Sequence, residues 1–443
     1  MKRMFVILAV FALVAGACTA GGDEEPTAPP TVNPTASQEP VTLELWSAWT
    51  SNREIRQFDA IFQAFEERYP WITVEDTGGI GDQKLIQAIN SGTAPDAVLS
   101  FGLDNVGKFC ASGAWQDLTP FMEQTGFDTS QFPDSIFQYT SFGGSQCALP
   151  FLTDVYGLYY NVDMFEAAGI AEPPKTMSEF VDVAEKLTVF NPDGSIKVAG
   201  FVPWTGYYET NPVTLSVPFG CPWYNADKTA SAFTDPCWED LFQWQKELVD
   251  FYGRDNLAKF VAGQGNEWTA ENDFETGRVA MNLDGEWRTA FIADDDPDLN
   301  YMTAPMPVPD DKADTYGVGQ VGGTIIGIPR GSEHAAEAWL LVSWMATDTA
   351  TLVYMANNVR NVPTTFASLE SPDLDVTPQF QTFLDMFANP ASHYKETTAI
   401  GDGDQSAIAQ QLEDWQAGKL TDVPAGLQEA AQAVDNLLAE QQG

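Results

Sequence analysis

The sequence predicts an α/β fold of two lobes, in which each lobe is a mostly parallel sheet flanked by helices. Segments with the two-residue alternation of strands take turns with segments that have the 3.6-residue spacing of amphipathic helices. Residues 41–443 form a body of about 400 residues, which is more than one hydrophobic core usually organises. The composition is that of a globular protein, with 44% hydrophobic and 12% aromatic residues.

The first elements of this body follow the pattern closely. Residues 41–46 (VTLELW) alternate apolar and polar side chains as a strand does, and a polar turn follows at 47–53. Residues 55–69 carry apolar side chains at helical spacing until a proline ends the helix. The next expected elements are a strand at 72–74, a helix at 84–90 and a strand at 96–100. Because ligands bind outside the carboxyl ends of strands in such sheets, the turns after Trp46 and Ser100 are candidate ligand loops.

The later chain repeats this alternation, without a solenoid repeat, a P-loop or a GxGxxG motif. The expected strands lie at 156–160, 279–283 and 324–328. The expected helices lie at 162–168, 178–188, 240–252, 333–345 and 427–440. This order predicts helices on both faces of each sheet.

The first eighteen residues predict export. Lys2 and Arg3 form a positive region, residues 4–14 are apolar, and Ala15-Gly16-Ala17 supplies the small side chains of a cleavage site. The apolar run is too short for a hydrocarbon core about 30 Å thick. The segment before Cys18 resembles a bacterial lipobox, although Ala15 stands where Leu is usual. We therefore expect a signal peptide at 1–17 and lipidation of Cys18, with an ordinary signal peptide as the alternative.

Residues 18–40 are expected to form a disordered tether behind the lipidated cysteine. The segment has no apolar periodicity and is rich in Pro, Thr, Gly and acidic residues. The formal net charge of the whole chain is −42. A nucleic acid or an anionic lipid surface as partner would require a basic face, so this balance argues against both.

Four cysteines remain after Cys18, an even number that suits disulfides in an oxidising compartment. Cys221 and Cys237 lie close together in a segment rich in Pro, Trp and Asp, so a local bridge is the simplest pairing and leaves Cys110 with Cys147. Metal binding is the alternative, but the chain has no CxxC motif and only two histidines. The scarcity of histidine also argues against Ser-His-Asp and Cys-His chemistry.

Seven segments, taken in order, resemble the family 1 extracellular solute-binding proteins, which are the sugar-binding subunits of ABC importers. They are FQAFEERYPWITVE (62–75), LIQAINSGTAPDAVL (85–99), FCASGAWQDLTPF (109–121), ALPFLTDVYGLYYNVDMFEAAGI (148–170), PPKTMSEFVDVAEKLT (173–188), FETGRVAMNLDGEW (274–287) and GGTIIGIPRGSEHAAEAWLLVSWM (322–345). The segments extend over about 280 residues behind a lipoprotein-like leader.

The resemblance implies the two-lobed periplasmic-binding-protein fold of type II, with hinge strands between the lobes and a sugar in the cleft that the hinge closes. By resemblance to maltose-type members, lobe 1 takes residues 41–150 and 305–350, and lobe 2 takes residues 151–304 and 351–443. The implied protein is an exported, lipid-anchored monomer that works with membrane permease subunits. We expect no cofactor, no metal and no enzymatic activity.

The chemistry of sugars selects the candidate site residues, because a pyranose stacks its apolar face on an aromatic ring and its hydroxyls need acceptors. Trp287 and Asp154 match the places where relatives carry a stacking ring and a carboxylate. The turn after the first strand contributes Trp49. Further candidates are Trp204, Tyr207 and Tyr208 in a second-lobe aromatic stretch, and Glu286, Asp104, Gln320, Trp268 and Arg360. Core packing, a cap or a surface position is the alternative for each of them.

Two other functions compete with capture of a carbohydrate, an oligosaccharide by our prediction. An exported glycoside hydrolase would also stack sugars on Trp and would need two carboxylates about 5 to 9 Å apart. The same fold with another cargo, such as a polyamine, iron or glycerol phosphate, is the second alternative. A phosphate cargo would require several convergent Arg or Lys side chains, and the chain has only 21 basic residues.

Overall fold

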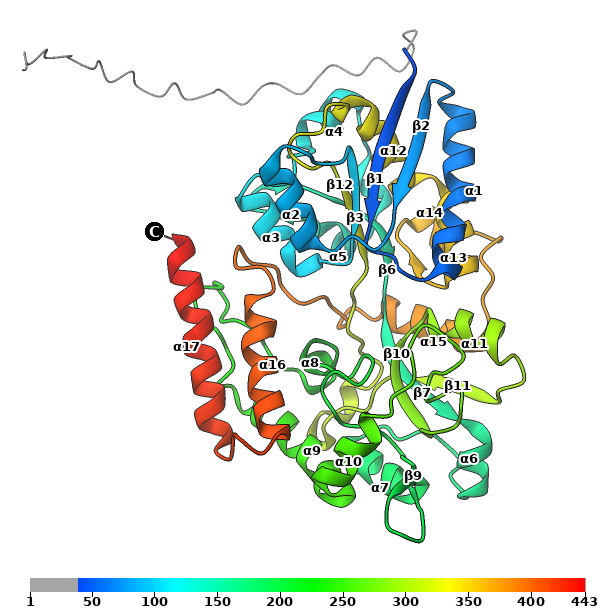
Figure 1. Ribbon diagram of the computed structural model, residues 1–443, viewed down its shortest axis with the longest axis vertical. Helices are drawn as coiled ribbons and strands as arrows, with labels where there is room; N and C mark the ends of the chain where they lie inside the picture. The colour runs from blue at the N-terminus through cyan, green and yellow to red at the C-terminus, as the bar shows by residue number, and fades with distance from the viewer. Residues whose placement is uncertain (1–38, 443) are drawn as a thin grey trace, which may run out of the picture.

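The computed structural model describes residues 39–442, which form two lobes, one above the other in Figure 1. The upper lobe is lobe 1 and the lower lobe is lobe 2. The predicted signal peptide at 1–17, the lipidated Cys18 and residues 19–38 of the predicted tether lie outside the described residues. In the described part of the chain, no helix has the length and apolar character that a membrane crossing needs.

Lobe 1 is built on a six-stranded sheet with the order β13-β6-β12-β3-β1-β2. Its strands are β1 (Val41–Ser47), β2 (Ile72–Thr77), β3 (Ala97–Ser100), β6 (Leu149–Thr153), β12 (Thr324–Gly327) and β13 (Val362–Pro363). β1 pairs in parallel with β2 and β3, whereas the β3–β12, β12–β6 and β6–β13 pairs are antiparallel. The sheet is therefore mixed: β1, β2, β3 and β6 run in one direction, as predicted, and β12 and β13 run against them. β12 enters lobe 1 from lobe 2, and β13 starts at the edge of the sheet where β6 ends.

Helices cover both faces of this sheet, as predicted. They are α1 (Asn52–Arg68), α2 (Asp82–Ser91), α3 (Val106–Ala111), α4 (Thr119–Thr125), α5 (Asp134–Gln138), α12 (Ala335–Thr347), α13 (Thr349–Val359) and α14 (Phe366–Leu369). The alternation in β1 buries Leu43 and Leu45 completely, and α1 packs Phe58 and Phe65 on them. Each such side chain contributes about 1.5 to 3 kcal/mol by leaving water. A short hairpin, β4 (Ser141–Phe142) and β5 (Ser145–Gln146), precedes β6.

Lobe 2 has a three-stranded sheet with the order β10-β7-β11 and a larger helical shell. The strands are β7 (Tyr156–Asn161), β10 (Met281–Gly285) and β11 (Tyr301–Ala304), and a separate hairpin joins β8 (Val189–Phe190) to β9 (Ile196–Val198). Both pairs of the main sheet are antiparallel, which corrects the prediction for this lobe. The reason is that β7 starts at the boundary between the lobes, while β10 and β11 run back toward it.

Nine helices of the described chain belong to lobe 2. They are α6 (Val162–Ala167), α7 (Met177–Leu187), α8 (Pro212–Phe219), α9 (Pro236–Tyr252), α10 (Arg254–Val261), α11 (Arg288–Asp295), α15 (Pro378–Ala388), α16 (Gly403–Gln416) and α17 (Val423–Gln442). α7 shows how local sequence sets a helix start, because Thr176 and Glu179 form a reciprocal capping box there. The predicted helices at 162–168, 178–188, 240–252 and 427–440 are confirmed.

The chain passes between the lobes after β6, before β12 and after β13, and the first two crossings lie side by side. The backbones of Asp154 and Gly322 exchange two hydrogen bonds of 3.3 and 2.8 Å. Gly323 has φ +141°, and an added Cβ would lie 2.3 Å from the carbonyl oxygen of Leu152. Glycine is therefore required where the two crossings approach each other.

All three lobe boundaries in the structure differ from the predicted ones, as the packing of each segment shows. The boundary at residue 150 falls inside β6, so lobe 1 continues to Thr153. Residues from 305 onward stay with lobe 2 at first, because the Val308 amide donates to the Lys175 carbonyl of that lobe. Residues beyond 350 stay with lobe 1, because α13 buries Leu352 and Met355 in the lobe 1 core. Local sequence does not mark these boundaries, since the cores that assign each segment form only in three dimensions.

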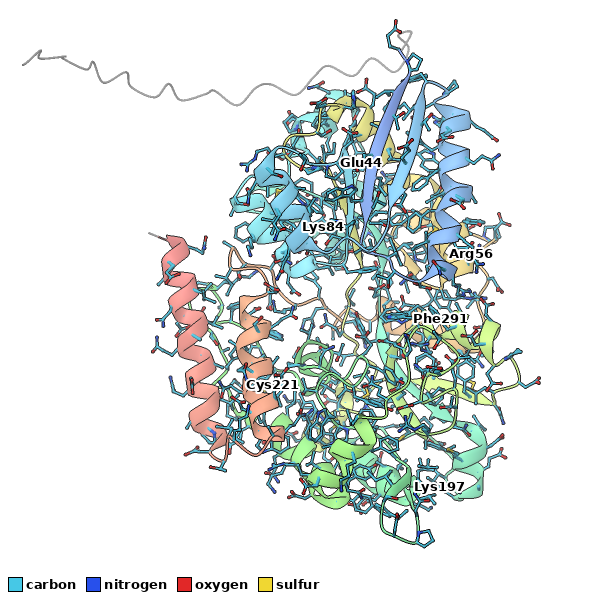
Figure 2. All side chains as sticks on the ribbon, viewed as in Figure 1. Glu44, Arg56, Lys84, Lys197, Cys221 and Phe291 are labelled. Carbon is cyan, nitrogen blue, oxygen red and sulfur yellow. A yellow bond between two sulfur atoms is a disulfide. The ribbon has the colours of Figure 1, made fainter. Side chains whose placement is uncertain are left out.

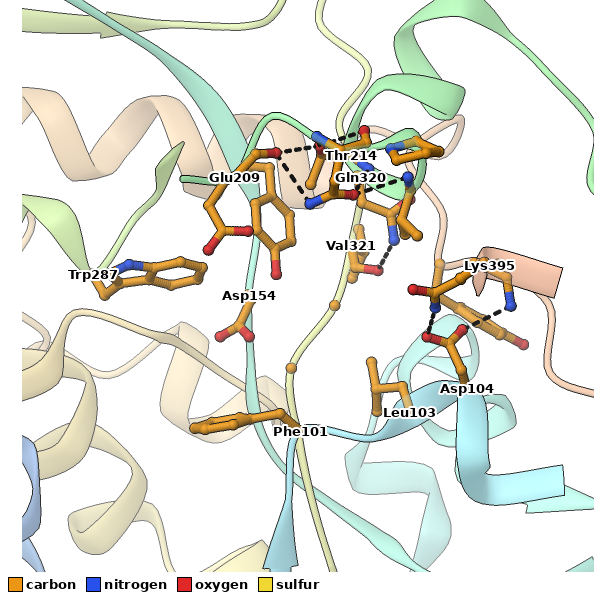
Figure 3. A pocket seen from close by; sticks show the side chains of 18 of the residues that line it. Phe101, Leu103, Asp104, Asp154, Glu209, Thr214, Trp287, Gln320, Val321 and Lys395 are labelled. Carbon is orange, nitrogen blue, oxygen red and sulfur yellow. Dashed lines mark hydrogen bonds and ion pairs between the residues drawn. The ribbon is translucent and has the colours of Figure 1, made fainter. Parts of the chain in front are cut away.

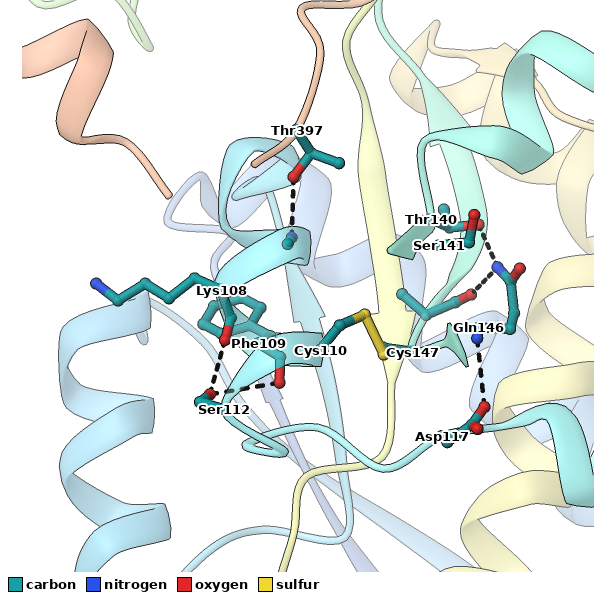
Figure 4. The surroundings of a disulfide bond; sticks show 12 residues. Lys108, Phe109, Cys110, Ser112, Asp117, Thr140, Ser141, Gln146, Cys147 and Thr397 are labelled. Carbon is teal, nitrogen blue, oxygen red and sulfur yellow. Dashed lines mark hydrogen bonds between the residues drawn. A yellow bond between two sulfur atoms is a disulfide. The ribbon is translucent and has the colours of Figure 1, made fainter. Parts of the chain in front are cut away.

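The structure confirms both predicted disulfides. Cys110 of α3 pairs with Cys147, just before β6, in lobe 1 (Figure 4). Cys221, labelled in Figure 2, pairs with Cys237 in the first turn of α9. The second bridge closes a short loop that contains no other helix or strand.

The Cys221–Cys237 bridge should stabilise lobe 2 mainly by restricting the unfolded chain. The two cysteines are 16 residues apart, and a loop of this size corresponds to about 3 kcal/mol. We expect the double variant Cys221→Ser, Cys237→Ser to lose free energy of unfolding on this scale in denaturant titrations. Peptide mapping of the oxidised wild type serves as the control. Alkylation of Cys221 or Cys237 in that sample without prior reduction would contradict the bridge.

Candidate ligand-binding cleft

A cleft of about 460 Å³ lies between the lobes, where the carboxyl ends of β1 and β3 meet lobe 2 (Figure 3). The turn after β1 contributes Trp49, and the turn after β3 contributes Phe101, Leu103 and Asp104. The prediction that these two turns line the site is confirmed. The crossing segments form the floor of the cleft, and the loops around α8 and α11 form its lobe 2 side.

Both lobes present aromatic rings to this cleft. In lobe 1, Trp49 meets Phe101 edge to face, with ring centroids 5.0 Å apart. In lobe 2, Trp287 contacts Tyr156 at 5.5 Å and Trp268 at 6.4 Å. Trp49 and Trp287 are buried, while Phe101 and Trp268 are 47% and 38% exposed. Exposed rings next to buried ones leave apolar faces available to a ligand.

Trp287 owes its position to the turn after β10. An added Cβ at Gly285 would lie 2.1 Å from the Trp287 ring, so glycine lets the indole fold back over its own turn. The indole nitrogen is buried next to the Asp284 carboxyl. Burial raises the pKa of Asp284, and the hydrogen bond from the indole nitrogen lowers it.

Asp154 lies at the floor of the cleft, on the first crossing. Its Oδ1 accepts a 2.5 Å hydrogen bond from the Asn361 amide, which also donates to Glu286 Oε1 at 3.0 Å. Glu286 Oε2 accepts from the Val155 backbone at 2.7 Å. Glu286, a predicted ligand residue, is fully buried and does not line the cleft. Its hydrogen bonds instead hold the crossing that carries Asp154.

Burial sets the charge state of the carboxyl groups in the cleft. Burial raises the pKa of Asp154 to about 7, against the hydrogen bond from Asn361, and the nearby Glu54 carboxyl adds to the shift. Burial likewise raises the pKa of Glu54 to about 7, although Arg53 lowers it. The pKa of Glu209 is well above its usual range because of burial and the neighbouring Glu267 carboxyl. Asp154 and Glu54 therefore exchange protons near neutral pH rather than near pH 4.

A buried arginine supports the lobe 2 side of the cleft. Arg288, in the first turn of α11, is completely buried and pairs with Asp284 at 2.9 Å, Glu275 at 3.2 Å and Glu267 at 3.8 Å. Its guanidinium also lies 5.9 Å from the Trp268 ring centroid. Three carboxyl groups around one cation leave this region with a surplus of negative charge. The sequence analysis missed Arg288, although its spacing of four residues from Asp284 is a usable signal.

At the other side of the cleft, Lys395 forms an ion pair with Asp104, one of the predicted site residues. Lys395 Nζ lies 2.9 Å from Asp104 Oδ1 and 2.8 Å from Asp404 Oδ2, and its side chain is 2% exposed. Gln405 also donates to Asp104. Asp104 lines the cleft as predicted, but its carboxylate is already bound within the protein (Figure 3).

Of the remaining candidates, Gln320 and Trp268 line the cleft, and Trp204, Tyr207, Tyr208 and Arg360 do not. These four predicted ligand residues lie outside the lining of the cleft, and each makes other contacts. The Tyr207 hydroxyl donates to Asp273 at 2.6 Å, and the Tyr208 hydroxyl accepts from the Asp273 amide at 2.9 Å. Trp204 packs against the lobe 2 core. Arg360 ends α13 with φ 69° and pairs with Asp375 at 2.6 Å.

Several residues that line the cleft were missed. Those that matter most here are Glu54, Tyr156, Glu209, Asn361 and Lys395. Glu54 could have been found, because it opens the helix that follows a predicted ligand loop. Glu209 lies two residues before Asn211, which caps α8, so it too is near a helix start. Asn361 and Lys395 carry no local signal, because tertiary packing alone brings them to the cleft.

Comparison with known proteins agrees with this geometry. The family model described as "Bacterial extracellular solute-binding protein" matches residues 49–352. The chain belongs to this family. Among the solute-binding proteins it resembles is an uncharacterized ABC transporter extracellular-binding protein of Pyrococcus horikoshii, 25% identical over 75% of this chain and 73% of the relative.

Two solved structures of one similar solute-binding protein, CpMnBP1, share the fold. The structure with mannotriose bound has a TM-score of 0.79 at 26% identity, covering 90% of this chain and 100% of that chain. The structure with mannobiose bound has a TM-score of 0.80 at 25% identity, covering 89% and 99%. The predicted two-lobed type II fold is thereby confirmed.

The raised pKa of Asp154 predicts how stability depends on pH. The unfolded chain releases this proton near pH 4, whereas the folded protein keeps it to about pH 7. The stabilising effect of the protonated form is therefore present at low pH and lost as pH rises through about 7. We expect the melting temperature of unliganded Asp154→Asn to fall less between pH 5 and pH 8 than that of wild type.

The matched control for this experiment is Glu123→Gln, at an exposed position on α4. Its melting temperature should follow the wild-type pH dependence. If Asp154→Asn also follows the wild-type curve, the buried carboxyl at residue 154 does not contribute to the pH dependence of folding.

Proposed function

We propose that this protein captures a carbohydrate, an oligosaccharide, in the cleft between its lobes and delivers it to the membrane permease of an ABC importer. The observation that carries the proposal is the pair of aromatic surfaces, Trp49 with Phe101 and Trp287 with Trp268, that face one cleft with the Asp154 carboxyl at its floor. Rings bind the apolar faces of sugars, and carboxyl oxygens accept from their hydroxyls.

The similar proteins support this proposal. The two CpMnBP1 structures hold mannotriose and mannobiose, and the Pyrococcus relative is named as part of an ABC transporter. A cargo of more than one ring also fits a cleft with aromatic surfaces on both lobes. We propose that the protein acts as a monomer and without chemistry of its own.

A phosphate cargo does not suit the charges at the cleft. Among the described residues that line it, Lys395 is the one basic side chain, and Asp104 and Asp404 already neutralise it. The other ionisable groups in the lining are carboxyls, among them Glu54, Asp154 and Glu209. Recognition of a phosphate group would need convergent cationic donors in their place.

Binding should depend on the Trp287 ring. We expect Trp287→Ala to weaken binding of the best sugar from a thermal-shift panel by about 1 to 3 kcal/mol, by analogy with stacking of bases on aromatic rings. Titration calorimetry measures the loss. Trp71→Ala is the matched control, since Trp71 is a partly buried tryptophan of lobe 1 outside the cleft. Normal binding by Trp287→Ala would contradict the cleft assignment.

The proposal of a binding protein, rather than a glycoside hydrolase, has its own test. Incubation of the wild type with the sugar that binds best should release no new reducing ends. A steady rise in reducing ends that is lost in Asp154→Asn would identify an enzyme instead.

We also propose that Cys18 is lipidated and holds the protein at the outer face of the cell membrane. Cys18→Ser should release the protein into the extracytoplasmic fluid, and sugar binding should stay unchanged because Cys18 lies before the folded body. Cell fractionation measures the release. Continued retention of Cys18→Ser in the membrane fraction would contradict lipid anchoring.

A further inference from the structure

The cleft around Trp287 has more carboxyl groups than basic groups in its lining. The carboxyls of Asp154 and Glu209 line it together with Glu54. Gln320 adds an acceptor, because its amide nitrogen donates to the Val321 carbonyl at 2.8 Å while its Oε1 is buried and has no partner. Gln320 is 4% exposed and lines the same cleft, as Figure 3 shows.

The protein itself uses most of the donors nearby. The Asn361 amide donates to Asp154 and Glu286, and Lys395 is bound between Asp104 and Asp404. The first free N–H groups of α8 donate to the Asn211 side chain, so the start of that helix offers no anion site.

The charged residues behind the cleft also leave an excess of negative charge. Arg288 lies next to three carboxyls. Burial raises the pKa of Glu209 and Arg288 lowers it, so one positive charge is shared among four carboxyls. Arg53 pairs with Asp294 at 2.6 Å. A low-dielectric site with an excess of carboxyls has a negative potential, which attracts cations.

A ligand that matches such a site must donate more than it accepts. A hydroxyl donates one hydrogen bond and also needs a donor, whereas an ammonium group donates three and accepts none. Aromatic faces such as those of Trp287 and Trp268 also attract a cation. We infer that the cargo is a saccharide that carries a protonated primary amine, which Glu209 and Asp154 bind beside the Trp287 ring. This inference rests on the proposed function and narrows its substrate class.

The crowding of the carboxyls agrees with this inference. Burial and neighbouring carboxyls raise the pKa values of Glu209 and Asp154. An ammonium group between them would favour their charged forms and form charge-assisted hydrogen bonds. A neutral sugar brings no positive charge, so the repulsion among the neighbouring carboxyls would remain.

Matched sugars test the inference directly. Titration calorimetry at pH 7.5 would compare the β-1,4-linked dimers and the monomers of glucose, mannose and galactose with their 2-amino and 2-acetamido counterparts. We expect one amino sugar to bind at least about tenfold more tightly than both neutral counterparts, the difference between a charged and a neutral hydrogen bond. If a neutral counterpart binds equally or more tightly, the inference that the cargo carries an amine is overturned. The proposed function then remains intact. No binding by any of these sugars would overturn the carbohydrate proposal itself.

A variant that removes the charge of Glu209 tests whether this cleft residue causes the preference for the amine. Glu209→Gln keeps the shape of the side chain and removes its charge, so we expect the preference for the amine over the hydroxyl to fall by about tenfold. Glu271→Gln, an exposed carboxyl on the same lobe, is the matched control and should keep the preference. An equal loss for amino and neutral sugars in Glu209→Gln, with wild-type circular dichroism, would overturn the role of its charge.

Discussion

The arrangement of the cleft depends on one buried amide. Asn361, at the start of β13 in lobe 1, donates to Asp154 on the first crossing and to Glu286 on the lobe 2 turn that carries Trp287. The two distances are 2.5 and 3.0 Å. The side chain thus links lobe 1, the crossing and lobe 2 directly beneath the cleft. Loss of this amide would remove the donor that the two buried carboxyls share, and only Glu286 would keep another donor, the Val155 amide.

Two ion pairs join the lobes at opposite sides of the molecule. Arg53 at the start of α1 pairs with Asp294 of α11, and its guanidinium lies 5.5 Å from the ring of Phe291, which Figure 2 labels between the lobes. On the side of α16, Lys395 connects Asp104 with Asp404. The cost of dehydrating charges offsets much of their attraction, so such pairs contribute more to the relative position of the lobes than to stability.

The same elements that hold the lobes also shape the recognition surface. The Gly285 turn folds Trp287 over itself, and Arg288, one residue further on, fixes α11 through its carboxyl partners. The charges of Arg288 and its partners are therefore paired beneath the rings, while Glu54, Asp154 and Glu209 line the cleft.

Local sequence determined most of the elements and part of the site. Apolar spacing identified α1 and α7, alternation identified β1, and the carboxyl-end rule led to Trp49 and to the loop of Phe101, because these signals depend on near neighbours in the chain. The family resemblance added Trp287 and Asp154.

Only the tertiary structure decided the strand directions, the lobe boundaries and the membership of the cleft. β12 is antiparallel to its neighbours because it returns from lobe 2, β13 is antiparallel to β6 because it starts at the cleft edge where β6 ends, and α13 belongs to lobe 1 because its apolar face packs there. Tyr207 and Arg360 look like ligand residues in sequence, yet each is bonded within its own lobe. Asn361 and Lys395 reach the cleft from distant parts of the chain. Contacts between residues far apart in sequence leave no periodicity or motif behind, so only the folded structure reveals them.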